Sequence, residues 1–518
     1  AGADSAWALD GKVPEPKPAV ALELDSVRAY TRPEGEGSSL LFTDVRPSDW
    51  AFQALMALVN HHGCASGLPG GRFEGRRALS RFEAAALLGA CLERVTVVTD
   101  DLQALTREFA AELALTRGRV DGLEARLGEL AATSFSTTTK LHVQATLVVG
   151  ANGFSGTATA LTAANRAAFG ATTASYDLQL TLDTSFKGND LLRAKLRAGN
   201  FGSNSFGGAG PSPLSQLEVA FQEYVGDPPV DGSDVVAIDR LYYQVPLGAF
   251  TLTAGGLVGQ DDMMALWPSV YPAETVLDVF TMPGAAAAYN KAAGVGGGLW
   301  WRSGGLSIST NYVAANGNNG NPAEGGVATS GAAGVGTVQI AYGAEQWALA
   351  VVYAHVANGD ELIPQGTPLA LASLAVAGHT DAFALAGYWQ PATAGWWPSI
   401  SAGWGLNGTS DRGNDNPETP LARASQSWSV GVQWRDVGLP GNGLGLAVGQ
   451  PTFATRLQGG ATPRDGGLIG EAWYKVQLSD AVSVTPALFV LGRPLGQETP
   501  SGKSFRQLGG LVKMSWRF

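Results

Sequence analysis

The amino-acid sequence predicts a mainly β protein: an antiparallel transmembrane β-barrel preceded by a small α-helical domain and a coiled-coil helix. Three observations lead to this fold class. Apolar and polar residues alternate from residue 135 onward, as they do along barrel strands. Helical periodicity is confined to residues 41–133. No apolar run approaches the ~20 residues of a spanning helix, so a membrane segment of this chain has to be a strand.

Composition limits the classes of partner. The chain has 518 residues, a net charge of −11 and 15% charged residues. It offers no surface rich in Lys and Arg that would attract phosphate, so we expect no nucleic-acid partner. Because the sequence starts at Ala1 without a basic and apolar leader, we expect that a signal peptide has been removed and that the protein is exported.

The first 95 residues contain an arm and both cysteines. Residues 1–40 include "KVPEPKP" and are expected to form a flexible or polyproline arm. Cys64 and Cys91 are the two cysteines of the chain. A local pair in an exported protein predicts a disulfide between them, and two buried free thiols are the alternative.

Residues 41–95 are expected to form two helices joined by a turn. Asp49 can cap the first helix, "SGLPGG" supplies the turn, and Ser80 can cap the second helix. The apolar stripes of the two helices consist of Ala51, Leu55, Leu58 and Val59, and of Phe82, Ala85, Leu88 and Leu92.

This segment resembles an S-layer homology (SLH) domain. The positions that carry the resemblance are Phe42, Asp44, Val45, Trp50, Ala51, Gly67, Gly70, Phe73, Ser80, Arg81 and Glu83. Ser80 replaces the Thr of the family pattern, and "RFE" follows it at residues 81–83. The resemblance implies binding to a polysaccharide linked to peptidoglycan.

The same resemblance assigns wall binding to Trp50, Gly67, Ser80 and Arg81. An arginine at a helix N-terminus adds hydrogen-bond donors to the positive end of the helix dipole, which favours an anion. The Trp50 ring could stack on a sugar. The alternatives are a Trp50 ring buried in the core and an Arg81 side chain that is only solvated.

A coiled-coil stalk is expected over residues 96–134. Its apolar residues recur at spacings of three and four: Leu102, Leu105, Phe109, Leu113, Thr116, Val120, Leu123, Leu127 and Leu130. A solitary helix would leave this seam in water, so the pattern predicts self-association. Gly118, Gly122 and Gly128 weaken the helix by about 1 kcal/mol each relative to Ala.

The remainder, residues 135–518, is predicted to be a β-barrel. In residues 428–435, for example, Trp and Val alternate with Ser, Gly, Gln and Arg. A β-sandwich would also bury one face of each strand. However, aromatic residues gather at strand ends, as in barrels with interface girdles, and 518 − 134 = 384 residues without a break are many for one sandwich.

The chain ends on "LVKMSWRF", an alternating strand with a terminal Phe518. Such an end resembles the signal by which outer-membrane barrels are recognised for insertion. The order of SLH domain, coiled coil, "FSTTTKLH", "LWPSVYPAETVLDVF" and terminal Phe is similar to the SLH-domain porins of cyanobacteria and their plastid relatives, whose barrels belong to the carbohydrate-porin (OprB-like) group.

This second resemblance implies an outer-membrane homotrimer of barrels with about 16 strands, surrounded by outer-membrane lipid, with the SLH domain and coiled coil in the periplasm. It favours passive diffusion of small inorganic ions and polar solutes. A carbohydrate-selective channel is the alternative within transport, and a mainly structural tether between outer membrane and peptidoglycan is the alternative outside it.

Motifs for catalysis are poor, and we expect neither an enzyme nor a cofactor or metal site. "GQETPSGKS", residues 496–504, mimics a phosphate-binding loop, but five residues instead of four separate its glycines and no helix is predicted to follow. "DRGNDNPE", residues 411–418, has oxygen ligands but lacks the frame of a calcium-binding hand, so an external loop is favoured.

Candidate pore-lining residues come from the strand "LLRAKLRAG". Arg193, Lys195 and Arg197 share one face of it, and a cation on the lipid face costs about 2–4 kcal/mol at membrane depth, so all three are expected to face the lumen and to favour anions. Asp261 and Asp262 lie in a long segment that could fold inward against them. A loop exposed to external solvent is the alternative for these two residues.

Overall fold

The computed structural model describes two compact units of the chain, one within Pro14–Thr137 and one from Thr138 to Phe518. The described residues are 48–62, 84, 85, 88, 92, 100–114, 138–225, 230–272, 274, 276–358, 362, 363, 365–374, 378–411 and 421–518. Within these ranges, helices long and apolar enough to cross a membrane do not occur. The arm at 1–40, both cysteines, Gly67, Ser80, Arg81, residues 115–134 and most of the 411–418 segment lie outside the described residues.

The helical unit is built around helix α2, Trp50–His62, and helix α4, Asp100–Glu108. Helix α2 begins directly after Asp49, whose carbonyl accepts the backbone N–H of Phe52 at 3.1 Å. Its buried face includes Ala51, Phe52 and Leu55. The predicted helical stripe at the start of this unit is therefore confirmed where the structure describes it.

Part of the expected coiled-coil seam lies inside the helical unit. Leu102, Leu105, Phe109 and Leu113 are at most 9% exposed and pack in one cluster with α2 residues such as Leu55. Self-association of this part of the seam is therefore the wrong expectation. The spacing of three and four predicts an apolar stripe but not the partner that buries it, and here the partner is the chain's own first helix.

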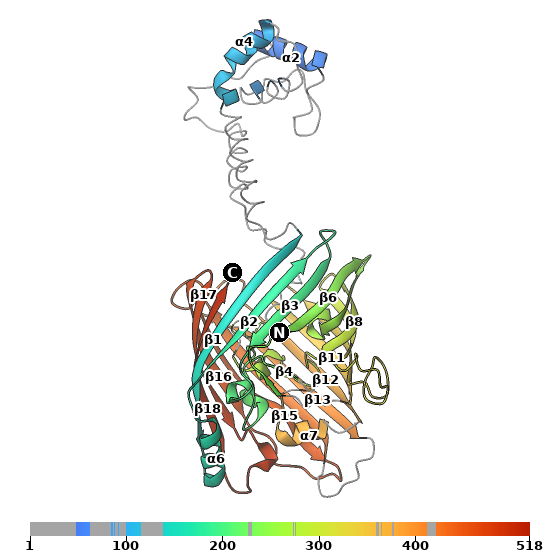
Figure 1. The fold of residues 1–518 in the computed structure, drawn as a ribbon, viewed down its shortest axis with the longest axis vertical. Coiled ribbons are helices and arrows are strands. Elements are labelled where there is room, and N and C mark those ends of the chain that lie inside the picture. The colour runs from blue at the N-terminus through green and yellow to red at the C-terminus, as the bar shows by residue number, and fades with distance from the viewer. Residues whose placement is uncertain are drawn as a thin grey trace. The chain divides into compact units, whose positions relative to one another are not determined.

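The second unit is a closed antiparallel barrel of sixteen strands within the described residues, so the predicted fold class is confirmed (Figure 1). Its strands are β1 Thr139–Ser155, β2 Thr173–Thr184, β3 Leu191–Gly199, β6 Ala237–Leu247, β7 Phe250–Gly259, β8 Ala293–Ser303, β9 Leu306–Ala314, β10 Gly334–Gly343, β11 Trp347–Ala357, β12 Gly378–Trp389, β13 Ser399–Asp411, β14 Ala422–Arg435, β15 Gly443–Leu457, β16 Ile469–Ser479, β17 Val482–Gly492 and β18 Arg506–Arg517. Each strand pairs with its neighbours in the barrel, and β1 pairs with β18 to close it.

Smaller elements lie in the connections. A hairpin of β4, Glu223–Val225, and β5, Val230–Gly232, belongs to the β3–β6 connection. Helix α6, Thr159–Phe169, joins β1 to β2, and helix α7, Pro368–Leu374, lies between β11 and β12. Both helices are at the same end of the barrel in Figure 1.

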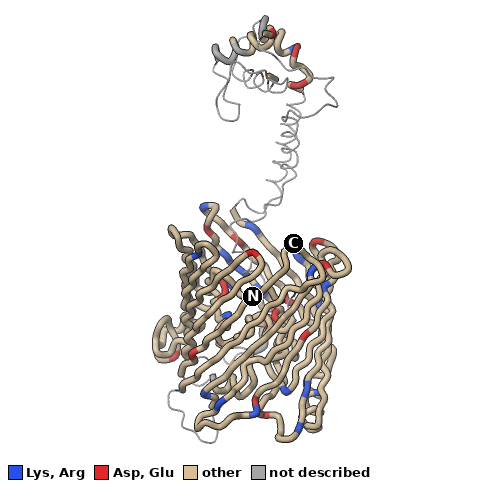
Figure 2. The backbone as a smooth tube through the Cα atoms, turned by 180° about the vertical axis from the view of Figure 1, so that it is seen from behind, with Lys and Arg blue, Asp and Glu red and all other residues tan. Residues whose placement is uncertain are grey.

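Alternation along the strands separates an outer face from an inner face. In β18, Leu508 and Val512 are 56% and 44% exposed, whereas Lys513 and Ser515 are each 3% exposed. Every second side chain points outward and is apolar, which contact with lipid requires in a membrane barrel. Figure 2 shows how few charged residues lie along the barrel strands. A sandwich would have buried these apolar side chains, so that alternative is excluded.

The two ends of the barrel differ in the length of their connections. At the end where β1 begins and β18 finishes, several strands are joined by tight turns, for instance Gly304 and Gly305 between β8 and β9. Both glycines have positive φ, 56° and 89°, which a two-residue hairpin of matching twist requires. Long connections lie at the other end. Short turns face the periplasm in outer-membrane barrels, and long loops face outward.

Exposed aromatic side chains gather at the short-turn end. They are Phe250, Trp347, Trp389, Trp396, Trp397 and Phe518. Aromatic rings of this kind prefer the boundary between hydrocarbon and water. Their position marks the periplasmic boundary of the membrane.

We expect Phe109→Ala to destabilise the helical unit by about 3–5 kcal/mol, because the ring is fully buried and its loss leaves a cavity. Limited proteolysis of the full-length protein measures this: cleavage within the first 137 residues should accelerate while the barrel stays protease-resistant. Gln103→Ala, at an exposed position of α4, is the control. Equal cleavage rates for the two variants would contradict the assigned packing.

Candidate pore and wall-binding site

The basic residues of β3 are paired with carboxylates on the lumen face of the barrel. Arg193 makes two hydrogen bonds of 2.8 Å to the Asp183 carboxylate. The two residues are direct cross-strand neighbours of β2 and β3, so their side chains leave the sheet on the same face. The guanidinium therefore meets the carboxylate as a planar fork.

The other two cations of β3 share further acids. Arg197 Nε lies 2.6 Å from Asp177, and Lys195 Nζ lies 3.5 Å from Asp239. The pairing of β3 with β6 shifts register at Asp239. The Asp239 carboxylate lies near the β3 cations at this irregularity. Each of the three cations therefore has an acidic partner that the sequence analysis did not assign, and their preference for anions stays a prediction.

Asp261 and Asp262 lie inside the barrel. They form the short 3-10 helix η4, Asp261–Met263, immediately after β7. Asp262 accepts a hydrogen bond of 2.7 Å from Arg240 Nε, and Asp261 lies 3.9 Å from the same guanidinium. Asp261 is 2% exposed, so external solvent does not surround this pair. The two acids join the basic wall at β6 rather than facing it across the lumen.

The β7–β8 connection, residues 260–292, folds into the barrel and reaches distant strands. Its middle is held by the Glu471 carboxyl on β16, which accepts the Tyr271 hydroxyl at 2.6 Å and the Leu277 backbone N–H at 2.9 Å. Glu274 of the same connection pairs with Lys513 on β18. We call Glu471 with its two donors the latch.

Further bonds hold this connection along its length. Ser401 of β13 accepts the backbone N–H of Tyr271 at 3.1 Å. Gln339 of β10 donates to the Leu266 carbonyl at 2.7 Å and accepts from the Tyr289 hydroxyl at 2.9 Å. Anchors on β10, β13, β16 and β18 mean that the connection spans the lumen rather than lining one side.

A second inward segment is the first part of the β3–β6 connection. Phe201, Phe206 and Leu217 are at most 2% exposed and join a buried cluster with residues of the β7–β8 connection and of β1 and β15–β18. The wall under this cluster includes apolar residues such as Phe489. The inner face of β1 and β15–β18 is therefore covered by packed side chains of the inward segments. The alternating pattern alone does not distinguish such a face from one that lines water.

A cavity of about 400 Å³ remains between the two inward segments and the wall. Charged side chains in its lining are Arg197, Glu218, Asp278 and Lys291. Lys291 Nζ lies 3.4 Å from Glu218 and 3.7 Å from Asp278. Burial raises the pKa of the Asp278 carboxyl to about 7.

The wall-binding candidates are described only in part. Trp50 is 52% exposed, while the adjacent Ala51 and Phe52 are buried. The Trp50 side chain is therefore not part of the buried core of the helical unit. Gly67, Ser80 and Arg81, like the Cys64–Cys91 pair, are outside the described residues and stay predictions.

Comparisons with known proteins agree with both units. Residues 41–85 match the S-layer homology domain family. The uncharacterized protein alr4550 of Nostoc sp. is 32% identical over 521 residues, which cover 91% of this chain and 85% of that protein. The chain belongs to the same family. With its SLH domain and closed sixteen-stranded barrel, it resembles the SLH-domain porins of cyanobacteria and has the architecture of an outer-membrane barrel.

Two further proteins are similar to this chain. The uncharacterized protein sll0772 of Synechocystis sp. is 29% identical over 508 residues, 87% of this chain and 86% of that protein. The structure of OprB from Pseudomonas putida at high pH covers 76% of this chain and 96% of its own, with 12% identity and a TM-score of 0.45. A likeness at that level says nothing about what this porin transports.

We expect Glu471→Ala to loosen the β7–β8 connection, because two hydrogen bonds to a carboxyl, about 1.5–3 kcal/mol each if it is charged, are lost and two buried donors are left without an acceptor. Single-channel recording should then show a larger and noisier conductance than wild type.

Glu324→Ala is the control for this prediction, since Glu324 is an exposed acid in the β9–β10 connection. If the Glu471 variant conducts as quietly as wild type and as the Glu324 variant, the latch does not restrain the constriction.

Proposed function

We propose that this SLH-domain porin is a passive diffusion channel for small inorganic ions and polar solutes. The observation that carries the proposal is the ion-paired wall of β2, β3 and β6 beside a cavity of about 400 Å³ under an inward-folded connection. A barrel with an apolar outside and charges inside suits transfer of hydrated solutes. Such a barrel fits a channel better than an enzyme.

The size and chemistry of the constriction favour ions over sugars. Paired charges of both signs can replace part of an ion's hydration shell on either side of the passage. Sugar channels need open aromatic faces, whereas the rings of Tyr271, Phe280 and Trp473 are buried against one another. A carbohydrate-selective channel stays the second candidate, and conductance block by sugars would support it.

We also propose that the SLH domain anchors the barrel to a peptidoglycan-linked polysaccharide from the periplasmic side. Trp50, exposed beside a buried core, supports a sugar-binding role. Anchoring and transport are compatible, so a tether function does not replace the channel.

A homotrimer is proposed for the assembled porin. Two hollows on the apolar outer wall support it, one over β11–β14 and one over β1 and β15–β18. Small residues such as Gly387 and Gly510 line them, and side chains of a neighbouring copy could enter. Cross-linking of the purified protein in mild detergent tests this assembly.

The decisive experiment for transport is planar-bilayer conductance of the full-length protein in KCl. We expect stepwise, ohmic channels. Bilayers that stay sealed while the protein is folded and inserted would leave only the tether function.

Selectivity should depend on the paired wall. Changing Arg193, Lys195 and Arg197 together to Gln leaves Asp177, Asp183 and Asp239 uncompensated, so the reversal potential under a KCl gradient should shift toward cations. We expect the permeability ratio to change by roughly twofold to fivefold, the factor that about 0.5–1 kcal/mol of screened charge interaction gives.

The mirror variant, with Asp177, Asp183 and Asp239 changed to Asn, should shift the reversal potential toward anions. If neither triple variant moves it while both conduct like wild type, these six residues do not line the conducting path.

Wall anchoring should depend on Arg81. We expect Arg81→Ala to reduce sedimentation of the full-length protein with peptidoglycan sacculi about tenfold or more, the loss of a charge-assisted contact to an anion. Arg107→Ala, which removes an exposed arginine of α4, is the control. Equal sedimentation of both variants would place the anion site elsewhere.

A further inference from the structure

We propose that the periplasmic mouth of the barrel contains a binding site for small oxyanions, formed chiefly by Lys475 of β16 and Arg517 of β18. The inference rests on the proposed channel function and specifies a solute class for it. The site is a hollow of about 320 Å³ at the short-turn end of the barrel. It is distinct from the paired wall of β2, β3 and β6.

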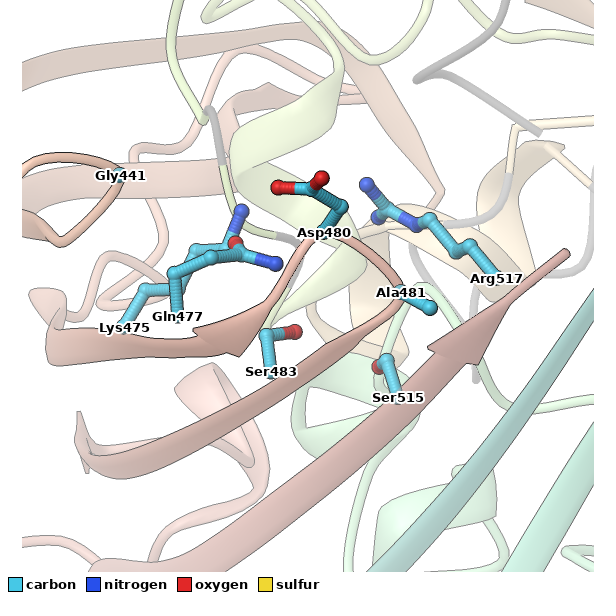
Figure 3. Close-up of a pocket in the computed structure, with 8 residues that line it drawn as sticks. All are labelled: Gly441, Lys475, Gln477, Asp480, Ala481, Ser483, Ser515 and Arg517. Carbon is cyan, nitrogen blue, oxygen red and sulfur yellow. The ribbon is translucent and has the colours of Figure 1, made fainter.

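Strand register brings the side chains of this hollow together. Gln477 of β16 is paired with Ser483 of β17, which is paired in turn with Ser515 of β18. Lys475 and Arg517 each lie two residues from a member of this row and so project on the same face. Figure 3 shows Lys475 and Arg517 on opposite sides of the hollow, with Asp480 between them and the two serines below.

The hollow differs from the rest of the charged lumen in its balance of charge. Its lining contains two cations and one carboxylate, that of Asp480 in the β16–β17 turn. In the part of the chain that the structure describes, an ion pair with Lys475 is not found, in contrast to Arg193, Lys195, Arg197 and Lys513.

The charged groups that act on Lys475 are one acid and two cations, so the positive charge of Lys475 is only partly compensated. Glu274, Arg517 and Lys513 all lie near enough to act on it electrostatically, and the Glu274 carboxylate is already bound to Lys513. Repulsion among three cations within a half-buried wall favours an anion between them. This is the physical reason for a ligand at this place.

The donors fit carboxylate or phosphate groups. A lysine ammonium offers a compact charge and an arginine guanidinium offers a planar fork, and both bind these oxyanions with charge-assisted hydrogen bonds. Arg517 already donates from Nε to Gln144 at 3.1 Å, which fixes the guanidinium while its terminal nitrogens remain available. The Ser483 and Ser515 hydroxyls can donate to further oxygens of the anion.

The site would concentrate small anions at the periplasmic mouth before or after passage. Positive side chains at a channel entrance raise the local concentration of anions and so their rate of entry. Selection of anions would then occur at the mouth, whereas the paired wall at the constriction contributes charges of both signs.

Calorimetric titration of the detergent-solubilised full-length protein with inorganic phosphate and with citrate tests this site. We expect saturable binding of citrate, and of phosphate more weakly. The double variant Lys475→Gln and Arg517→Gln should raise the Kd for citrate about tenfold or more, as loss of charge-assisted contacts requires. Asp480→Asn, which removes the one negative charge, should lower the Kd.

A second double variant, Lys503→Gln and Arg506→Gln, removes two exposed cations from the long-connection end and should bind like wild type. Unfolded protein is recognised by loss of the heat-modifiable gel shift of the barrel. The site is refuted if wild type does not bind citrate, or if the two double variants, both folded, bind it equally.

In bilayers, citrate should interrupt the wild-type current from one side only, and the Lys475 and Arg517 variant should lack these interruptions. If the protein forms no channel at all, the proposed function fails, while calorimetry still decides whether the anion site exists.

Discussion

The hydrogen-bonded pairing of β1 with β18 is the constraint on which the rest of this structure depends. At membrane depth an unpaired strand edge leaves backbone N–H and C=O groups without partners, each at a cost of several kcal/mol. Closure removes both edges and divides the side chains into an apolar outside and a sheltered inside. Only because an inside exists can two long connections fold into it and bury their own apolar residues there.

Within that enclosed space, charge is balanced mainly by pairs. Arg193 with Asp183, Arg197 with Asp177 and Arg240 with Asp262 each bring opposite charges together where water is restricted. Removing one partner of such a pair leaves a buried charge uncompensated, which costs more than the pair itself contributes. The lumen therefore behaves as a network whose members depend on one another, whereas the lining of the hollow at Lys475 and Arg517 contains two cations and one carboxylate.

Much of this architecture could be predicted from the sequence, since period-two alternation is a local property. Val512 against Lys513, or Leu196 against Arg197, suffices to place a strand and its two faces. The pairing of distant residues is not local: nothing in the segment around Asp177 states that its partner is Arg197, and nothing around Tyr271 points to Glu471. The alternation of "GEAWYK" does put Glu471 on the inner face, a signal that could have marked it. The apolar stripe at Leu105 and Phe109 likewise predicts the buried face of a helix. It does not predict whether a second molecule or helix α2 covers that face, because this depends on tertiary packing.

Phe518 exchanges two backbone hydrogen bonds with Val143, its N–H donating at 3.0 Å and its carbonyl accepting at 2.8 Å. The seam of the barrel therefore joins residues that are 518 − 143 = 375 positions apart in the sequence. The sheet closes only when β18 lies beside β1, and until then both of these strands are open edges. Contacts of such sequence separation form slowly, so these open edges can pair with other chains until the barrel closes.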